Sequence, residues 1–214
     1  MKKILLVAAA LFFAAGTALA GPVVDFASSA FSGVNGQTQA TVNFGGVDYT
    51  FTAYPAGAKL TWNPGPAGGV DGIGINDDEI TGAVLNSNDE LLKISFSKPL
   101  YVTGIYITDL FKESSYREAG LYQLNYATGA WSDWISFQAD PSQVPGTNGE
   151  LFIALDPANL LGLKFTTPDY YLPLLDPRND FSVRGINVPE PATMLLLGCG
   201  LIGMAACGRK KLIR

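Results

Sequence analysis

Short segments of alternating apolar and polar residues, separated by glycine, proline, asparagine and aspartate, dominate the middle of the chain. Leu92, Ile94 and Phe96 alternate with polar residues, which is the period-two pattern of a strand with one buried face. Helical periodicity is nearly absent, with one turn at most at 156–160. The pattern predicts an all-β fold, an antiparallel β-sandwich that is jelly-roll-like. Further strands are predicted at 41–44, 47–53, 59–62, 101–110, 121–126, 131–137, 151–155, 163–167 and 181–188.

Three local features predict how these strands connect. Lys98-Pro99 is expected to turn the chain between two strands, and residues 127–130 are expected to form the turn of a hairpin. In the last strand the apolar register changes at Gly185, and a β-bulge there would absorb the extra residue.

The chain begins with the three parts of a secretion signal. Two lysines precede an apolar run at 4–15, and the small residues Ala18 and Ala20 suit the pocket of a signal peptidase. We therefore expect a signal peptide at 1–20, cleaved by signal peptidase before Gly21. The run is short for a membrane span, which makes an uncleaved anchor helix the less favoured alternative.

A second apolar segment, followed by basic residues, lies at the carboxyl end. Residues 192–208 are apolar and span ~25 Å as a helix, and residues 209–214 form a basic end. Basic clusters stay on the cytoplasmic side of a membrane, so the domain before the helix is expected outside. A C-terminal transmembrane helix is thus predicted to flank an exported domain at 21–187.

A Pro-Glu-Pro triplet stands immediately before the apolar segment. The triplet, the apolar helix and the basic end together resemble the PEP-CTERM sorting signal of Gram-negative bacteria, over residues 188–214. The resemblance implies that an exosortase, a membrane cysteine transpeptidase, reads the motif and that the tail is removed after transit. The motif residues are Val188, Pro189, Glu190 and Pro191.

The same resemblance implies a location and a setting. It places the protein at the cell surface or outside the cell, beside exopolysaccharide in a biofilm or extracellular matrix. One alternative stays open, in which the tail is kept and the protein is a permanently anchored envelope protein.

The expected domain at 21–187 is acidic and lacks histidine. It holds 8 of the 14 basic residues and 18 of the 19 acidic ones, a net charge of about −10. Such a surface repels phosphates, so no nucleic acid partner is expected. The absence of histidine removes Ser-His-Asp catalysis and histidine-ligated metal sites. Both cysteines, Cys199 and Cys207, lie in the tail, and we expect a protein that is not an enzyme.

An oxygen-rich segment between residues 71 and 90 is the sharpest candidate for a metal site. Calcium prefers carboxylate, amide and carbonyl oxygens as ligands. The segment is not an EF-hand, because Ile73 and Ile75 stand where oxygen ligands are needed. Two interpretations stay open, a structural Ca2+ site and a solvated acidic loop. The candidate ligands are Asp71, Asn76, Asp77, Asp78, Glu79 and Asp89.

A second group of carboxylates defines an alternative function. Asp109, Glu113 and Glu118 surround the loop after the strand at 101–110. Two carboxylates at a suitable separation can cleave a glycosidic bond. The alternative function is therefore a small carboxylate-dependent glycan hydrolase or lyase, and the competing interpretation is a solvated loop.

Aromatic residues gather around the predicted hairpin. The segment 122–134 resembles part of the discoidin-type, galactose-binding-like sandwiches, and Tyr126, Trp131 and Trp134 are candidates for weak carbohydrate binding. The competing interpretation is that these rings fill the core. The function predicted from the whole sequence is a non-catalytic adhesion domain at the cell surface or in the matrix.

Overall fold

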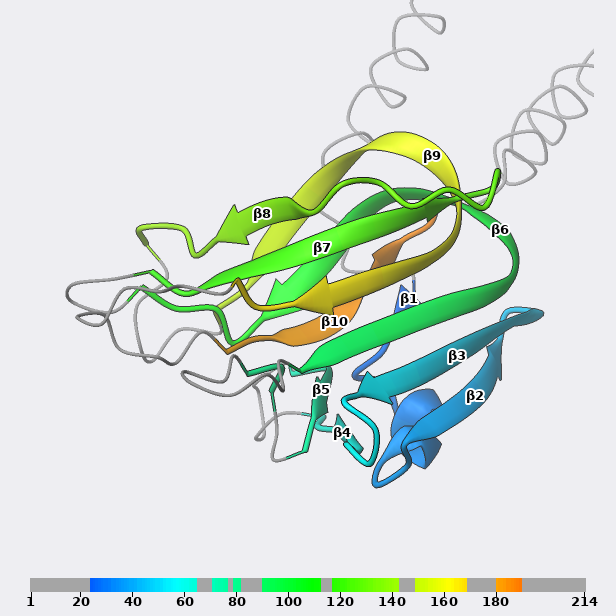
Figure 1. Cartoon of the computed structure of the whole chain (residues 1–214), viewed down its shortest axis with the longest axis horizontal. Helices are drawn as coiled ribbons and strands as arrows, with labels where there is room; N and C mark the ends of the chain where they lie inside the picture. The colour runs from blue at the N-terminus through cyan, green and yellow to red at the C-terminus, as the bar shows by residue number, and fades with distance from the viewer. Residues whose placement is uncertain are drawn as a thin grey trace, which may run out of the picture.

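One antiparallel sheet makes up most of the described chain (Figure 1). The computed structural model describes residues 24–64, 71–76, 79–81, 90–112, 117–142, 149–168 and 180–189. Within these residues lie β1 (Val24–Asp25), the 3-10 helix η1 (Ser29–Val34), β2 (Gln39–Phe44), β3 (Val47–Tyr54), β4 (Leu60–Trp62), β5 (Ile73–Ile75), β6 (Leu91–Thr108), β7 (Ala119–Tyr126), β8 (Ile135–Gln138), β9 (Leu151–Thr166) and β10 (Ser182–Asn187).

All ten strands of the described residues belong to one hydrogen-bonded sheet. Its main path runs β4-β5-β10-β6-β9-β7-β8, with β1 paired to β10 and the β2–β3 hairpin paired to β6. Every pairing is antiparallel. The prediction of an all-β antiparallel fold is therefore confirmed. The jelly-roll-like sandwich stays a prediction, because the pairing does not separate into two sheets.

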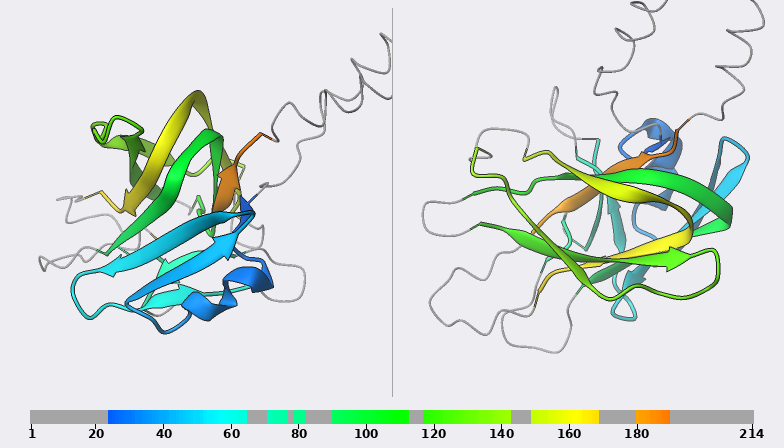
Figure 2. Two further views of the ribbon diagram at one scale, coloured as in Figure 1. Left: turned by 90° about the vertical axis from the view of Figure 1, so that its right-hand side faces the viewer. Right: turned by 90° about the horizontal axis from the view of Figure 1, so that it is seen from above.

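The long strands β6 and β9 curl this sheet over (Figures 1 and 2). They pair from Leu91 opposite Thr166 to Ile107 opposite Leu151. The first part of β6 also pairs with β3, whereas its last part pairs with β10. One bent pair of strands thus carries two limbs of the sheet, which we call the β3 limb (β2, β3 and β7, β8) and the β10 limb (β1, β4, β5, β10).

The bend explains why two sequence predictions are wrong. Lys98-Pro99 does not end a strand, because it lies inside β6, and the two strands predicted at 151–155 and 163–167 are one continuous strand, β9. The register of the β6–β9 pair shifts between Ser95 and Leu100, so Pro99 lies in an irregular stretch. No regular strand pairing there requires the backbone N–H that proline lacks. Irregular stretches of this kind bend a strand and increase its twist.

Two other connections follow the prediction. The turn at 127–130 is confirmed, with the Gly129 N–H donating to the Tyr126 carbonyl at 2.7 Å and Gly129 at φ +85°. The bulge in β10 is confirmed as well, because its register against β6 shifts between Val183 and Gly185. The strand after the turn begins later than predicted, at Ile135.

Buried aromatic rings fill the inside of the curl. Phe26 meets Phe51 of β3 edge to face, with ring centroids 5.2 Å apart. Phe137 of β8 meets Phe181, just before β10, at 5.1 Å, and this contact joins the two limbs. A Cβ on Gly120 would lie 2.1 Å from the Phe137 ring, so only glycine fits between these rings.

The predicted end segments lie largely outside the described residues. The signal peptide at 1–20 and the helix at 192–208 are not among them, and of the sorting motif only Val188 and Pro189 are. Among the residues that are described, no helix has the length and apolar character needed to cross a membrane.

Candidate functional site

The sorting motif follows directly on β10, a strand with neighbours on both sides. β10 pairs with β6 as far as Asn187 opposite Gly104. The Asn187 amide donates to the Thr103 hydroxyl at 2.9 Å. Val188 is half-buried and packs against the core, and Pro189 is exposed. The motif thus begins without a linker after the folded sheet. Glu190 and Pro191 lie outside the described residues.

The beginning of the described chain lies beside this junction. Val24 of β1 is opposite Ile186 of β10, and the Phe26 N–H donates to the Arg184 carbonyl at 2.7 Å. The predicted signal cleavage positions Ala18, Ala20 and Gly21 lie outside the described residues.

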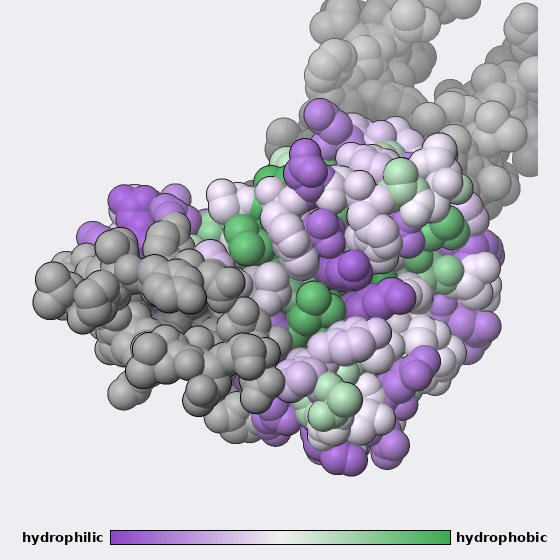
Figure 3. All heavy atoms as spheres, viewed as in Figure 1, coloured by the Kyte–Doolittle hydropathy of each residue, from purple (hydrophilic) through white to green (hydrophobic). Residues whose placement is uncertain are grey.

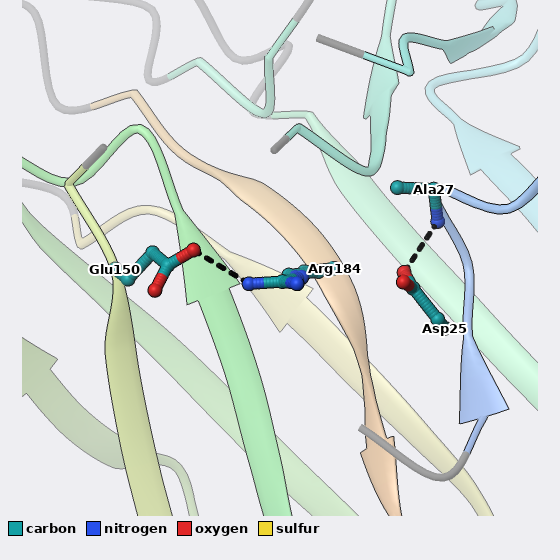
Figure 4. A network of polar contacts seen from close by, with 4 residues as sticks. All are labelled: Asp25, Ala27, Glu150 and Arg184. Carbon is teal, nitrogen blue, oxygen red and sulfur yellow. Dashed lines mark hydrogen bonds and ion pairs between the residues drawn. The ribbon is translucent and has the colours of Figure 1, made fainter. Parts of the chain in front are cut away.

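Arg184 is the bulged residue of β10, and its side chain reaches across the sheet (Figure 4). Its guanidinium pairs with the Glu150 carboxylate at 2.6 Å. On the other side of β10, the Asp25 carboxylate accepts the Ala27 N–H at 3.0 Å and closes a turn after β1. The ion pair ties β10 to the start of β9, and backbone pairing with β1 and β6 holds β10 on its two sides.

The oxygen-rich segment is described in part, and the described part serves the fold. Ile73 to Ile75 form the buried strand β5, which the sequence analysis had placed in a loop. Asn76 adopts φ +59°; its side-chain oxygen accepts the Lys59 N–H at 3.1 Å and its amide donates to the Glu90 carboxylate. The other Glu90 oxygen accepts the Thr81 N–H at 2.8 Å. Asn76 and Glu90 therefore connect the end of β5 to the start of β6.

The remaining candidate calcium ligands divide into two groups. Asp71 precedes β5 and Glu79 follows it, whereas Asp77, Asp78 and Asp89 lie outside the described residues. Within the part of the chain that the structure describes, no group of three or more histidine, cysteine, aspartate or glutamate side chains is placed to hold a metal ion. The calcium prediction thus rests mainly on residues outside that part.

The second carboxylate group also contributes to folding. Glu118 is buried, and its carboxylate accepts the Phe111 N–H at 2.5 Å. The Glu118 backbone donates to the Phe111 carbonyl at 3.0 Å, so these residues close the neck of one loop. Asp109 begins that loop with φ +58°, and Glu113 lies outside the described residues.

The aromatic residues around the turn divide between the core and the surface. Tyr122 and Phe137 are buried, whereas Tyr126 and Trp134 are 37% and 41% exposed. Trp131 is half-buried and forms an isolated bridge with Asn125. The core interpretation is thus confirmed for Tyr122 and Phe137, and carbohydrate binding by the exposed rings stays a prediction.

Two lysines that the sequence analysis did not single out lie beside this aromatic group. The Lys164 ammonium lies 4.0 Å from the centroid of the Trp131 ring, a cation–π contact. Lys93 of β6 stands directly opposite Lys164 of β9. Burial lowers the pKa of the Lys164 ammonium, and the positive charge of Lys93 lowers that pKa further.

The comparisons with known proteins bear on the carboxyl end. A family model described as the PEP-CTERM protein-sorting motif matches residues 187–211. A comparison with curated proteins found no match to the chain. The match begins at Asn187, the last residue of β10, and includes the triplet, the apolar segment and the start of the basic end. The chain therefore carries a PEP-CTERM protein-sorting motif, which indicates an exported cell-surface protein that an exosortase sorts.

Proposed function

We propose that the domain before the sorting motif is a non-catalytic adhesion module that contacts exopolysaccharide at the cell surface or in the extracellular matrix. The observation that supports it most is the exposure of Tyr126 and Trp134 around a single turn of the sheet. Large aromatic rings contribute strongly to contacts when a partner covers them. Trp131, from the same turn, adds a third ring that is partly covered by Lys164.

A non-catalytic role agrees with how the candidate acids are used. Glu118 is buried and accepts a backbone N–H, which is a structural task for a carboxylate. The chain contains no histidine to serve as a general base. The glycan hydrolase or lyase remains the alternative, and it requires Asp109, Glu113 and Glu118 to take part in turnover.

Calcium binding at the oxygen-rich segment is a further part of the proposal, as a structural ion beside β5. Asp71, Asp77, Asp78 and Glu79 lie close together in the sequence on both sides of this short strand. Carboxylates gathered in this way repel one another, and a bound Ca2+ would remove the repulsion. Asn76 is not proposed as a calcium ligand, because its side chain already accepts the Lys59 N–H and donates to the Glu90 carboxylate.

Glycan binding is tested with the full chain in detergent and exopolysaccharide from the cells that export it. Trp134→Ala and Tyr126→Ala are each expected to weaken co-sedimentation with the polysaccharide. Phe152→Ala is the matched control, because Phe152 is 38% exposed and lies opposite Tyr106, in a part of β9 that does not pair with β7. Equal binding by the wild type and the Trp134→Ala, Tyr126→Ala double variant would contradict the proposal.

A further inference from the structure

A row of polar side chains crosses the outer face of the β3 limb. The pairings Gln39–Thr52, Thr52–Lys93, Lys93–Lys164 and Lys164–Gln123 are consecutive, so five strands contribute one residue each. Adjacent strands lie ~4.8 Å apart, which makes the row ~19 Å long. Lys93 and Lys164 form its centre, and each stands between two buried residues of its strand, so both side chains are on the outer face.

Within the described residues, the two lysines at the centre have no counterion. Like charges directly opposite each other on a sheet are unfavourable. No ion pair joins Lys93 or Lys164 to any residue of the described chain. This is unexpected in a domain with 18 acidic and 8 basic residues, where carboxylates are plentiful. The sheet therefore presents two adjacent positive charges that an external anion can neutralise.

The rows on either side of the lysines differ in character. One is largely apolar, and its Tyr54 is 43% exposed. The other has three short polar side chains and one glycine. This face lies toward the viewer in Figure 3, where strongly hydrophilic side chains occupy the middle with apolar ones between them. The apolar row consists of Tyr54, Leu91, Thr166 and Leu121, and the short polar row of Thr50, Ser95, Gly162 and Asn125.

We propose that this face binds an acidic polysaccharide, with Lys93 and Lys164 contacting the carboxylates of uronic acid units. The inference rests on the proposed function and names its ligand class. A sugar ring has polar edges, which match the lysines and the short polar row, and an apolar face, which matches the apolar row. A polymer with one carboxylate per sugar also suits a pair of adjacent cations that stands alone on this face. Double-stranded nucleic acid, with one charge per ~1.7 Å of its axis, is repelled by the net charge of about −10 more strongly than a polymer with one carboxylate per sugar.

The test measures binding of polygalacturonate, a uronic acid polymer, to the full chain in detergent. The variant Lys93→Gln, Lys164→Gln is expected to bind about tenfold more weakly, because two charge-assisted contacts are lost. Lys59→Gln, Lys98→Gln makes the same change of charge at two exposed lysines elsewhere and is expected to bind like the wild type. Lys93→Arg, Lys164→Arg keeps the charges and is expected to retain binding, which guards against loss through misfolding.

Several results would overturn the inference. Unchanged affinity in the Lys93→Gln, Lys164→Gln variant would do so, as would equal weakening in the control pair. Lysine-dependent binding to phosphatidylglycerol vesicles without binding to polygalacturonate would show a membrane contact instead. Failure of this inference is distinguished from failure of the proposed function by the native exopolysaccharide. If that polymer binds through Trp134 but independently of the lysines, only the inference fails, and if no polysaccharide binds, both fail.

Discussion

Val24 of β1 lies directly opposite Ile186 of β10, which brings the first described strand beside the last. Ile186 is two residues from Val188, where the sorting motif begins, and Val24 is three residues after Gly21, the predicted start of the exported domain. The described strands that lie nearest in sequence to the two predicted processing positions are therefore neighbours in the sheet. A sorting enzyme that acts on the motif meets a strand that is already paired on both sides.

Glu118→Ala is expected to destabilise the domain by about 1–3 kcal/mol, because the buried Phe111 N–H loses its acceptor. Glu118→Gln retains an oxygen acceptor and is expected to cost less. Chemical denaturation measures both, and release of reducing sugar from the native exopolysaccharide is assayed in parallel. If the wild type releases sugar and Glu118→Gln does not, the hydrolase alternative is correct.

Gly120→Ala is expected to destabilise the domain by about 1–3 kcal/mol through overpacking. The added methyl group would lie 2.1 Å from the Phe137 ring and 2.7 Å from the Phe181 ring, which join the two limbs. Gly33→Ala serves as the control, since nothing lies within 4 Å of its Cβ position. A shift in the thermal midpoint for Gly33→Ala as large as for Gly120→Ala would contradict this account of the core.

Alkaline pH is expected to destabilise the domain through Tyr49. Burial raises the pKa of the Tyr49 phenol from 10.0 to about 12. The unfolded state therefore loses its proton first, and the stability that is present below pH 10 falls as the pH rises toward 12. Urea unfolding at pH 8 and pH 11 measures the loss, which Tyr49→Phe is expected to reduce and Tyr101→Phe to leave unchanged. An identical loss in both variants would assign the pH dependence to other groups.

Calcium is expected to raise the thermal midpoint if the oxygen-rich segment binds it. A site filled at ~100 times its dissociation constant stabilises by ~2.7 kcal/mol, a shift of roughly 5 to 10 °C. The full chain is melted in millimolar calcium and in EDTA, and Asp77→Asn, Asp78→Asn is expected to abolish the shift. Identical melting curves of the wild type in calcium and in EDTA would contradict the calcium site and favour a solvated acidic loop.

Sequence patterns correctly predicted those structural features that are set by residues close together in the chain. The alternation at Leu92, Ile94 and Phe96 identified one face of a strand, and the register change at Gly185 identified the bulge, because both follow from side-chain periodicity. Ile73 and Ile75 were misassigned, since a strand of three residues between acidic and glycine residues has too short a pattern to detect.

Features that depend on strand pairing could not be predicted in the same way. Lys98-Pro99 is typical of a turn, yet pairing of β6 with β9 on both sides of it keeps the strand continuous. Lys93 and Lys164 are 71 positions apart in the sequence and meet only because that pairing sets their register. Their juxtaposition is therefore a property of the sheet, and no local motif indicates it.

Intact-mass analysis of the protein exported by its native cells tests the account of sorting most directly. Processing at both ends predicts a species that begins at Gly21 and lacks the apolar segment 192–208 and the basic end. The mass also identifies any group attached at the new carboxyl end. A species that still ends at Arg214 would contradict removal of the tail and would establish the permanently anchored envelope protein.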